Sequence, residues 1–269
     1  MTFVSHAQNF EDVMLWRSLR EVSEGFYIDI GAHDPKIESV THAFYERGWR
    51  GINVEPVRRF FEALQNEREF DLNINCAVGD AIGEIDFWSV EGGGLSTAVK
   101  EQAARHRASG NRVTPTKVDV RTLESICDDY VQGRAIHFLK IDVEGFEENV
   151  LKGANFERYR PWIVVVEATL PMSQVETHQM WEHILLNSDY LLCYKDGLNR
   201  FYLAKEKEDL LSRFTYPPNY FDDFVVYSMS EDGQLEMVRW QHDLMANSLS
   251  WRITAPLRRI KDIFRLFFE

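Results

Sequence analysis

The chain has 269 residues, of which 45% are hydrophobic and 13% aromatic, a length and composition that support one sizeable core and exclude a disordered protein. Its formal net charge of −13 repels nucleic-acid phosphates, which argues against broad nucleic-acid binding. No apolar stretch reaches the roughly 18 residues of a membrane span, and no basic region followed by an apolar run marks a secretory signal, so we expect a cytoplasmic protein. Three widely spaced cysteines are expected to be reduced thiols: Cys76, Cys127 and Cys193.

Short apolar runs alternate with amphipathic stretches along most of the chain. In chain order we predict a helix at residues 13–19, a strand at 26–30, a helix at 39–47, a strand at 51–55, a helix at 58–69, strands at 72–78 and 84–90, a helix at 120–130, a strand at 136–141, a helix at 147–152, a strand at 162–166, a helix at 178–187 and strands at 190–194 and 200–203. This alternation predicts an α/β fold with a parallel sheet, helices on both faces and a ligand beyond the carboxyl ends of the strands.

Two stretches depart from the simple alternation. The last two strands are joined by a short loop, which forces them to pair antiparallel because a parallel crossover needs about a dozen residues or more. Residues 91–115, which contain three consecutive glycines, are the least regular part of the chain. Such a stretch is typical of a functional lid or of a disordered segment.

The first motif with chemical content follows the predicted strand at 26–30. Gly31 allows a ligand to approach the backbone closely, and Asp29 near the strand end can order the loop or meet a cationic amino group. Glu55, 26 residues further on at the end of the next strand, suits a carboxylate that accepts both hydroxyls of a ribose. The glycines of a dinucleotide fingerprint are missing and Asp34 stands where a pyrophosphate would lie, so the motif favours a cofactor with adenosine but no phosphate. The alternative is a tight turn in a nonbinding domain.

The second motif is the charged end of the strand at 136–141. Lys140, Asp142 and Glu144 alternate with apolar residues, so period two places the charged set on one face. One reading is a salt-bridge cluster that only shapes the turn. The other is that Asp142 faces the reacting group as a general base or a metal ligand.

The N-terminal segment has two possible roles, and one histidine is a further candidate site residue. Ser5 with Gln8, and more loosely Asn9 with Asp12, fit a helix capping box, and these polar residues fit a ligand pocket equally well. His33 lies in the glycine loop and is a candidate acid–base group. The other histidines are expected to be structural or exposed. The sequence contains no H-x-x-x-H or H-E-x-x-H pattern, so a zinc site is not expected.

Taken together, these motifs resemble the FkbM family of methyltransferases. The matching segments are SHAQNFEDVML, GFYIDIGAHDP, WRGINVEP, NCAVGD, GLST, LKIDVEGFEENVL, WIVVVEA, DGLNRFY and PPNYFDDFV. The resemblance implies a class I methyltransferase (Rossmann-like) fold, with a seven-stranded, mainly parallel sheet and helices on both faces. It also implies S-adenosylmethionine as cofactor and an O-methyltransferase acting on hydroxyls of sugars or other secondary metabolites.

The resemblance also assigns residues to the site. The cofactor contacts that it implies are Gln8, Glu11, Asp12, Asp29, Gly31, Ala32, Glu55, Ala77 and Asp80. It places Asp142 and Glu144 near the transferred methyl group. At position 33 this chain has His where many members look to have Asn, so the role of His33 is open.

Methyl transfer to an alcohol requires loss of the hydroxyl proton. Asp142, Glu144 or His33 could accept this proton, and a divalent cation could instead lower the pKa of the hydroxyl. Residues 92–97, including Ser96 and Thr97, are expected to close over the acceptor, and Asp196 and Asn199 to bind its hydroxyls.

A C-terminal extension, residues 229–269, is predicted to follow a methyltransferase domain at 1–228. Its last twenty residues carry five basic and two acidic side chains, and apolar residues recur there at helical spacing. A basic amphipathic helix can lie on the anionic inner face of a membrane, pack on its own domain or bind a partner. Residues 250–258 also resemble a segment of bacterial polysaccharide-assembly proteins, which suggests a glycosyltransferase partner.

The sequence therefore predicts an S-adenosylmethionine-dependent O-methyltransferase for a sugar hydroxyl of a bacterial polysaccharide or glycoconjugate. One alternative is a noncatalytic cofactor-binding scaffold in a glycan-assembly complex. The other is a nucleotide-dependent oxidoreductase, against which the missing phosphate-loop glycines argue.

Overall fold

A computed structural model describes residues 2–91, 94–227 and 234–235 of the chain. The chain divides into two units, Met1–Phe224 and Val225–Glu269. The amphipathic tail predicted at 240–269 lies outside the described residues. Within the described part of the chain, no helix combines the length and the hydrophobicity needed to cross a bilayer.

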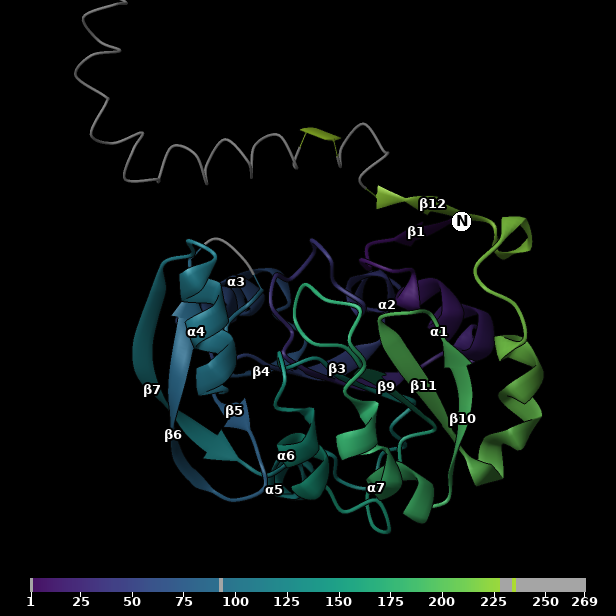
Figure 1. Cartoon of the computed structure of the whole chain (residues 1–269). Coiled ribbons are helices and arrows are strands. Elements are labelled where there is room, and N and C mark those ends of the chain that lie inside the picture. Colours follow the sequence, from purple (N-terminus) through teal and green to yellow (C-terminus); the bar gives the residue numbers. More distant parts are fainter. Residues whose placement is uncertain (1, 92–93, 228–233, 236–269) are drawn as a thin grey trace, which may run out of the picture. The chain divides into compact units, whose positions relative to one another are not determined.

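The first unit is built on a mixed sheet of seven strands (Figure 1). These are β2 (Phe26–Ile30), β3 (Arg50–Val54), β4 (Leu72–Ile74), β8 (Phe138–Ile141), β9 (Ile163–Glu167), β10 (Tyr190–Lys195) and β11 (Asn199–Ala204), in the spatial order β10-β11-β9-β8-β2-β3-β4. The neighbours from β9 to β4 are parallel, whereas β11 is antiparallel to both of its neighbours. The prediction of a mainly parallel sheet with an antiparallel closing pair is confirmed.

Helices cover both faces of this sheet, as predicted. Figure 1 shows α1 (Glu11–Leu19), α2 (His42–Glu46) and α3 (Arg58–Glu67) on one face, and α5 (Leu123–Tyr130), α6 (Glu147–Lys152) and α7 (Glu182–Asn187) on the other. The alternation of β2 explains the two layers, because Ile28 and Ile30 join the core under α5 and α6 while Tyr27 joins the core under α1 and α2. Burying each such side chain stabilises the fold by about 1.5–3 kcal/mol.

Shorter elements complete the described chain. They are β1 (Phe3–Ser5), β12 (Phe224–Val226) and the 3-10 helices η1 (His178–Met180), η2 (Lys205–Phe214) and η3 (Tyr220–Asp222). Arg17 on α1 fastens the segment around η3, because its guanidinium contacts both carboxylate oxygens of Asp222 at 2.6 Å and donates to three backbone carbonyls.

A second sheet departs from the sequence prediction. It consists of β5 (Ala77–Val78), β7 (Val113–Arg121) and β6 (Gly83–Val90), with β7 in the middle, and α4 (Lys100–Ala108) lies between β6 and β7 in the chain. The strand predicted at 72–78 is therefore two strands in two different sheets. Residues 91–115, predicted as irregular, contain α4 and the start of β7, and the helix predicted at 120–130 begins only at Leu123.

The reason for this error is the composition of β7. Its residues are mostly exposed and polar, and the alternation of Val118 and Val120 with charged residues is too short to indicate a strand of this length. The strand forms because β7 pairs with β6 in an eight-residue antiparallel register from Gly83 opposite Val120 to Val90 opposite Val113. A partner some thirty residues away is not visible in the local sequence.

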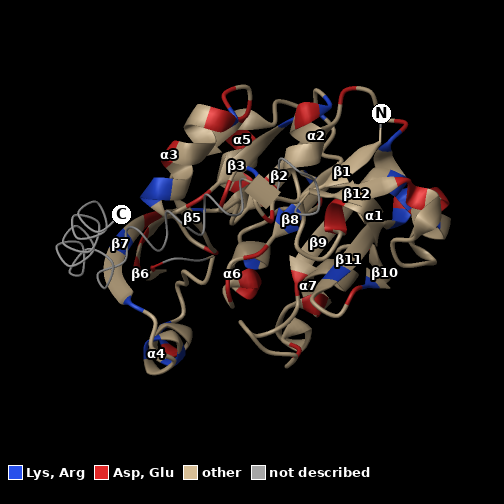
Figure 2. Cartoon of the chain, turned by 90° about the horizontal axis from the view of Figure 1, so that it is seen from above, with Lys and Arg blue, Asp and Glu red and all other residues tan. Residues whose placement is uncertain are grey.

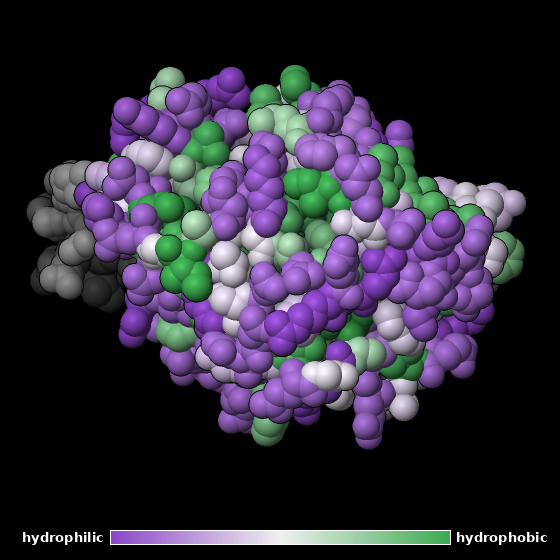
Figure 3. All heavy atoms as spheres, turned by 90° about the horizontal axis from the view of Figure 1, so that it is seen from below, coloured by the Kyte–Doolittle hydropathy of each residue, from purple (hydrophilic) through white to green (hydrophobic). Residues whose placement is uncertain are grey.

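Charged, polar and hydrophobic residues are interspersed over the described surface. Seen from the side of α1, α2 and α3, acidic and basic segments are interspersed (Figure 2). On the opposite side, small hydrophobic areas are scattered among hydrophilic residues (Figure 3).

Candidate active site

A cavity of about 330 Å³ opens at the carboxyl ends of β2, β3 and β8. This is the edge of the sheet where the alternation of strands and helices predicted a ligand. The predicted site residues that line it are Gln8, Asp29, Gly31, Ala32, His33, Glu55, Ala77, Ser96, Asp142 and Glu144. Those that follow β2, β3 and β8 are brought together because these strands are parallel neighbours, whereas Gln8, Ala77 and Ser96 reach the cavity from other segments.

Gly31 forms the turn at the end of β2. Its backbone φ is +79°, and a β-carbon built on it would lie 1.9 Å from the backbone oxygen of Asp142. Its N–H donates to the backbone oxygen of Val54 at 2.9 Å. The turn is therefore packed between the ends of β3 and β8, and only glycine fits there.

Lys140 organises the charges beside this turn. Its Nζ lies 3.3 Å from Oδ1 of Asp29 and 3.4 Å from Oδ2 of Asp142, and it donates to the backbone oxygen of Gly31 at 2.8 Å. Burial alone would lower the pKa of Lys140, but the two carboxylates raise it above its ordinary value. The salt-bridge cluster considered for this strand end therefore forms in part: Lys140 pairs with Asp142 as considered, but its second acid is Asp29 and not Glu144.

Glu55 holds two loops of the cavity together. Its Oε2 accepts the backbone N–H of His33 at 2.9 Å, and its Oε1 accepts the backbone N–H of Val57 at 2.7 Å. Burial raises the pKa of Glu55 to about 7. Because each carboxylate oxygen has a second lone pair, Glu55 can accept hydroxyl groups in addition to these two bonds.

His33 lies against the wall of the cavity. Its ring packs on Phe60, with 3.9 Å between the ring centroids, and a β-carbon on Gly94 would come within 3.6 Å of it. Burial lowers the pKa of His33 to about 4. The imidazole is therefore neutral at pH 7 and is able to accept a proton.

An acidic wall of carboxyl groups surrounds Asp142 at the carboxyl ends of β8 and β9, and among the three glutamates described next Glu144 lines the cavity. Burial and the nearby Asp142 raise the pKa of Glu144 to about 9, and the same two causes raise the pKa of Glu167, at the end of β9, to about 11. Burial raises the pKa of Glu147 to about 7, although its Oε1 accepts the backbone N–H of Gly145 at 3.0 Å. Glu144 and Glu167 therefore hold their protons at neutral pH, and because Oε2 of each has no hydrogen-bond partner in the described part of the chain, each is able to act as a hydrogen-bond donor.

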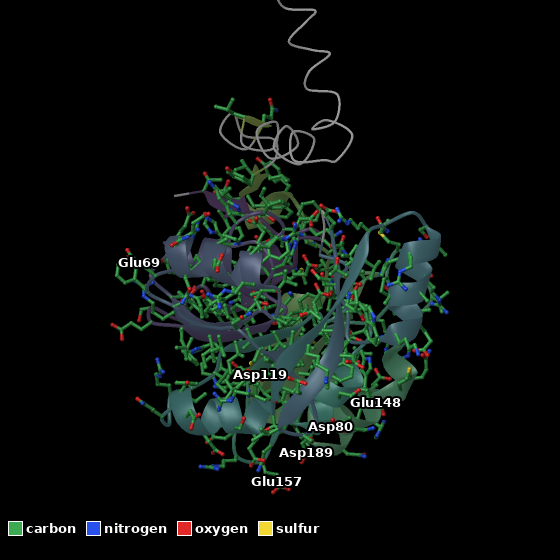
Figure 4. All side chains as sticks on the ribbon, turned by 90° about the vertical axis from the view of Figure 1, so that its left-hand side faces the viewer. Glu69, Asp80, Asp119, Glu148, Glu157 and Asp189 are labelled. Atoms are coloured by element: carbon green, nitrogen blue, oxygen red, sulfur yellow. The ribbon has the colours of Figure 1, made fainter. Side chains whose placement is uncertain are left out.

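Some predicted site residues do not line the cavity. They are Glu11, Asp12, Asp80, Thr97, Asp196 and Asn199. Thr97 donates through Oγ1 to the backbone oxygen of Glu144 at 2.9 Å, so it positions the acidic wall from behind. Asp80 is exposed and lies in the lower part of the view in Figure 4.

The N-terminal residues form a network that supports the cavity. Glu11 accepts the side-chain amide of Asn199 at 2.7 Å and the backbone N–H of Asn9 at 2.9 Å. Asp196 in turn accepts the side-chain amide of Asn199 at 3.1 Å. Asp196 and Asn199, which were predicted to bind acceptor hydroxyls, thus make contacts within the protein that join the β10–β11 hairpin to the start of α1.

The predicted capping boxes do not form. The residue before α1 is Phe10, in a left-handed conformation and without a side-chain cap. The Ser5 hydroxyl instead donates to Asp12 at 2.7 Å, and Asp12 also accepts the backbone N–H groups of His6 and Ala7 at 2.7 and 3.2 Å. Asp12 therefore orders the loop that presents Gln8 to the cavity.

The structure adds lining residues that the sequence did not single out. They include Glu38, Phe60, Phe87, Phe146 and Met172. The carboxyl-rich wall also extends to Glu167, which does not itself line the cavity. Glu167 ends a buried strand directly beside β8, so the rule that placed Asp142 in the site could have found it. The aromatic residues come from helices and from the second sheet, whose positions the local sequence does not reveal.

The comparison with known proteins agrees with this geometry. Residues 29–192, more than half of the chain, match the methyltransferase FkbM domain. No curated protein matches the chain at a significant level. The matched region runs from Asp29 in β2 into β10 and includes the carboxyl ends of every strand that borders the cavity. The chain therefore belongs to the FkbM methyltransferase family.

Proposed function

We propose that this protein is an S-adenosylmethionine-dependent O-methyltransferase whose acceptor is a sugar hydroxyl of a polysaccharide or glycoconjugate. The observation that carries the proposal is the pairing of the Gly31 turn with Glu55 at the edge of a cavity in an FkbM-family domain. The strand order with β11 as the antiparallel member supports a class I methyltransferase fold.

The residues present fit such a cofactor. The close approach of the Gly31 turn to β8 leaves backbone rather than side chain facing the cavity, and Glu55 is a buried carboxylate with lone pairs for ribose hydroxyls. Phe60, Phe87 and Ala77 supply apolar surface for a base, and Gln8 and Asp29 supply polar atoms for an amino-acid group. The bound cofactor would supply a methyl group already activated as a sulfonium.

Different residues of the cavity would accept the proton of the acceptor hydroxyl and donate a hydrogen bond to the acceptor. Asp142, whose side chain is 40% exposed, and the neutral His33 are proton acceptors in the cavity. Glu144 keeps its proton at neutral pH, so we assign it to donating a hydrogen bond to the acceptor and not to removing its proton. Of the three residues considered as the base, Asp142 and His33 remain.

The charge of this wall favours an uncharged acceptor. Glu38 and Asp142 line the cavity as acids, the protonated Glu144 adds no positive charge, and the Lys140 ammonium is already engaged by Asp29 and Asp142. A phosphate or carboxylate next to the reacting hydroxyl would be repelled there, whereas sugar hydroxyls both donate to and accept from such groups.

The test combines a product assay with a binding assay. The purified protein is incubated with labelled cofactor and neutral glycan acceptors, and the products are analysed for added methyl groups by mass. Calorimetry then compares Glu55→Ala with Glu62→Ala, a control at an exposed glutamate on α3. We expect Glu55→Ala alone to weaken cofactor binding; equal affinity of the two folded variants would remove Glu55 from the cofactor site.

The proposed activity does not depend on the role of the C-terminal tail, residues 240–269. Contact with the inner face of a membrane, or with a glycosyltransferase, through residues 240–269 stays a prediction because these residues lie outside the described part of the chain. Liposome flotation of the full chain against a chain ending near residue 230 tests it.

A further inference from the structure

A cluster of potential metal ligands lies outside the cavity. His6 follows β1, and His42 and Glu46 are one turn apart on α2. Their ligand atoms all lie within 4.8 Å of one another, and among the described residues these three form the group of His, Cys, Asp and Glu that meets this criterion. The His42 Nε2 and Glu46 Oε1 atoms are 3.2 Å apart, and the two imidazole centroids are 4.4 Å apart.

We propose that His6, His42 and Glu46 bind one zinc ion. Zinc is held by imidazole nitrogens and carboxylate oxygens at about 2.0–2.2 Å, and three protein ligands with a water in the fourth position are a frequent zinc site. Ligand atoms about 2.1 Å from a tetrahedral metal are about 3.4 Å apart. The His42 Nε2 to Glu46 Oε1 separation of 3.2 Å is close to this spacing, and the other ligand atoms lie within 4.8 Å, so small side-chain rotations would complete the site.

Backbone carbonyls orient both imidazoles. Nδ1 of His42 lies 3.0 Å from the backbone oxygen of Pro35, and the ring of His6 hydrogen-bonds to the backbone of Lys36. A ring that donates one N–H to a carbonyl presents the lone pair of its other nitrogen to a metal, and this arrangement commonly supports zinc-binding histidines.

Nearby charges do not forbid a cation. Arg68 contacts Nδ1 of His42 at 3.3 Å, but its own charge is matched by Asp71 at 3.2 Å, with both side chains fully buried. Lys36 is a second cation close to His6. The Glu46 carboxylate, whose side chain is 52% exposed, supplies the negative charge and the route by which an ion would enter.

Such an ion would join two walls of the cavity. Ala7, next to His6, forms an isolated bridge with Glu38, and both Gln8 and Glu38 line the cavity. None of the three proposed ligands lines it. We therefore assign the zinc a structural role, in which it would hold the Gln8 loop against the Glu38 segment without contacting the acceptor.

The experiment uses the full chain after treatment with a chelator. Zinc is titrated in competition with a fluorescent indicator, and cobalt is added as a probe whose visible absorption reports nitrogen and oxygen ligands. His6→Gln and Glu46→Gln are compared with His183→Gln, at an exposed histidine on α7, and with Glu62→Gln, which like Glu46 lies four residues from a partner on a helix. Circular dichroism verifies that each variant is folded.

We expect the wild type and both controls to bind one zinc, and His6→Gln and Glu46→Gln to bind it at least about tenfold more weakly. Zinc should also raise the melting temperature of the wild type and leave that of His6→Gln unchanged. Unaltered zinc affinity in the His6 and Glu46 variants, or no zinc binding by the wild type, would overturn the proposal. Neither outcome depends on whether the protein transfers methyl groups.

Discussion

Replacing Gly31 by alanine tests how closely β2 and β8 approach at the cavity. An added β-carbon lowers the free energy of unfolding for two separate reasons. The φ of +79° is unfavourable for any residue with a β-carbon, which costs about 1–2 kcal/mol. The contact of 1.9 Å with the Asp142 backbone oxygen also forces the strand ends apart, and backbone shifts of this kind cost about 1–3 kcal/mol more.

Gly48 separates these two penalties. Its φ is +87°, yet a β-carbon there would have no atom within 4 Å. Gly48→Ala should therefore lose only the conformational part, about 1–2 kcal/mol. Gly31→Ala should lose about 2–5 kcal/mol, equivalent to a fall in melting temperature of roughly 4–20 °C at about 2–4 °C per kcal/mol.

Urea unfolding of both variants measures the difference, and calorimetry measures the cofactor affinity. Gly31→Ala should also weaken cofactor binding, because it displaces the loop whose His33 N–H bonds to Glu55. Gly48→Ala should leave the affinity unchanged. If the two variants lose equal stability, the steric contact with Asp142 is not a constraint and the reasoning about the turn is wrong.

Three further predictions concern charged groups. Lys140→Met leaves its two carboxylate partners without a cation and should destabilise the fold by about 3–5 kcal/mol in urea unfolding; an unchanged midpoint would contradict this. The pKa of Glu144 is about 9 in the fold against 4.5 ordinarily, so the folded state binds the proton more tightly and stability falls as pH rises through this window, by at most about 1.4 kcal/mol per pH unit. Glu144→Gln should flatten that loss in thermal melts across the window, and an equally steep loss would refute the assignment. Arg17→Lys cannot reproduce the paired contacts with Asp222 and should lower stability by about 1–3 kcal/mol, whereas full stability would show that the η3 segment is held by other contacts.

The sequence predicted the cavity well because strand ends carry the necessary information. Asp29, Gly31, Glu55 and Asp142 each stand at or just beyond the end of a buried apolar run, and parallel strands bring such ends to one edge of a sheet. The antiparallel pair β10–β11 was predicted from the short loop that joins the two strands, whereas the spatial order of the strands was not predicted. The family comparison confirms the resemblance that these motifs carried.

Other features depend on partners that are remote in the chain. Glu11 was predicted to contact the cofactor, but its carboxylate is engaged by Asn199, 188 positions away. The proton held by Glu144 arises from burial beside Asp142, which composition alone does not disclose. The strand β7 exists because β6 pairs with it. In each case the outcome depends on which side chains or strands meet after folding, and neither propensity nor periodicity specifies that.

The junction between β4 and β5 limits which parts of the cavity border can be altered by insertion or exchange. Only Asn75 and Cys76 separate the two strands, and the Asn75 side chain donates to the backbone oxygen of Glu55 at 2.8 Å, so this junction is anchored to the cofactor side. The segment from β6 through α4 to β7 is held by its own hairpin and by the Thr97 hydroxyl, which donates to the backbone oxygen of Glu144, and residues 94–98 of this segment border the cavity on the side proposed for the acceptor. Insertions there cost little, about 0.6 kcal/mol for each doubling of loop length. In the proposed enzyme, acceptor range and cofactor binding are therefore separable traits, and we expect that exchanging this loop alters the former while Gly31 and Glu55 stay in place.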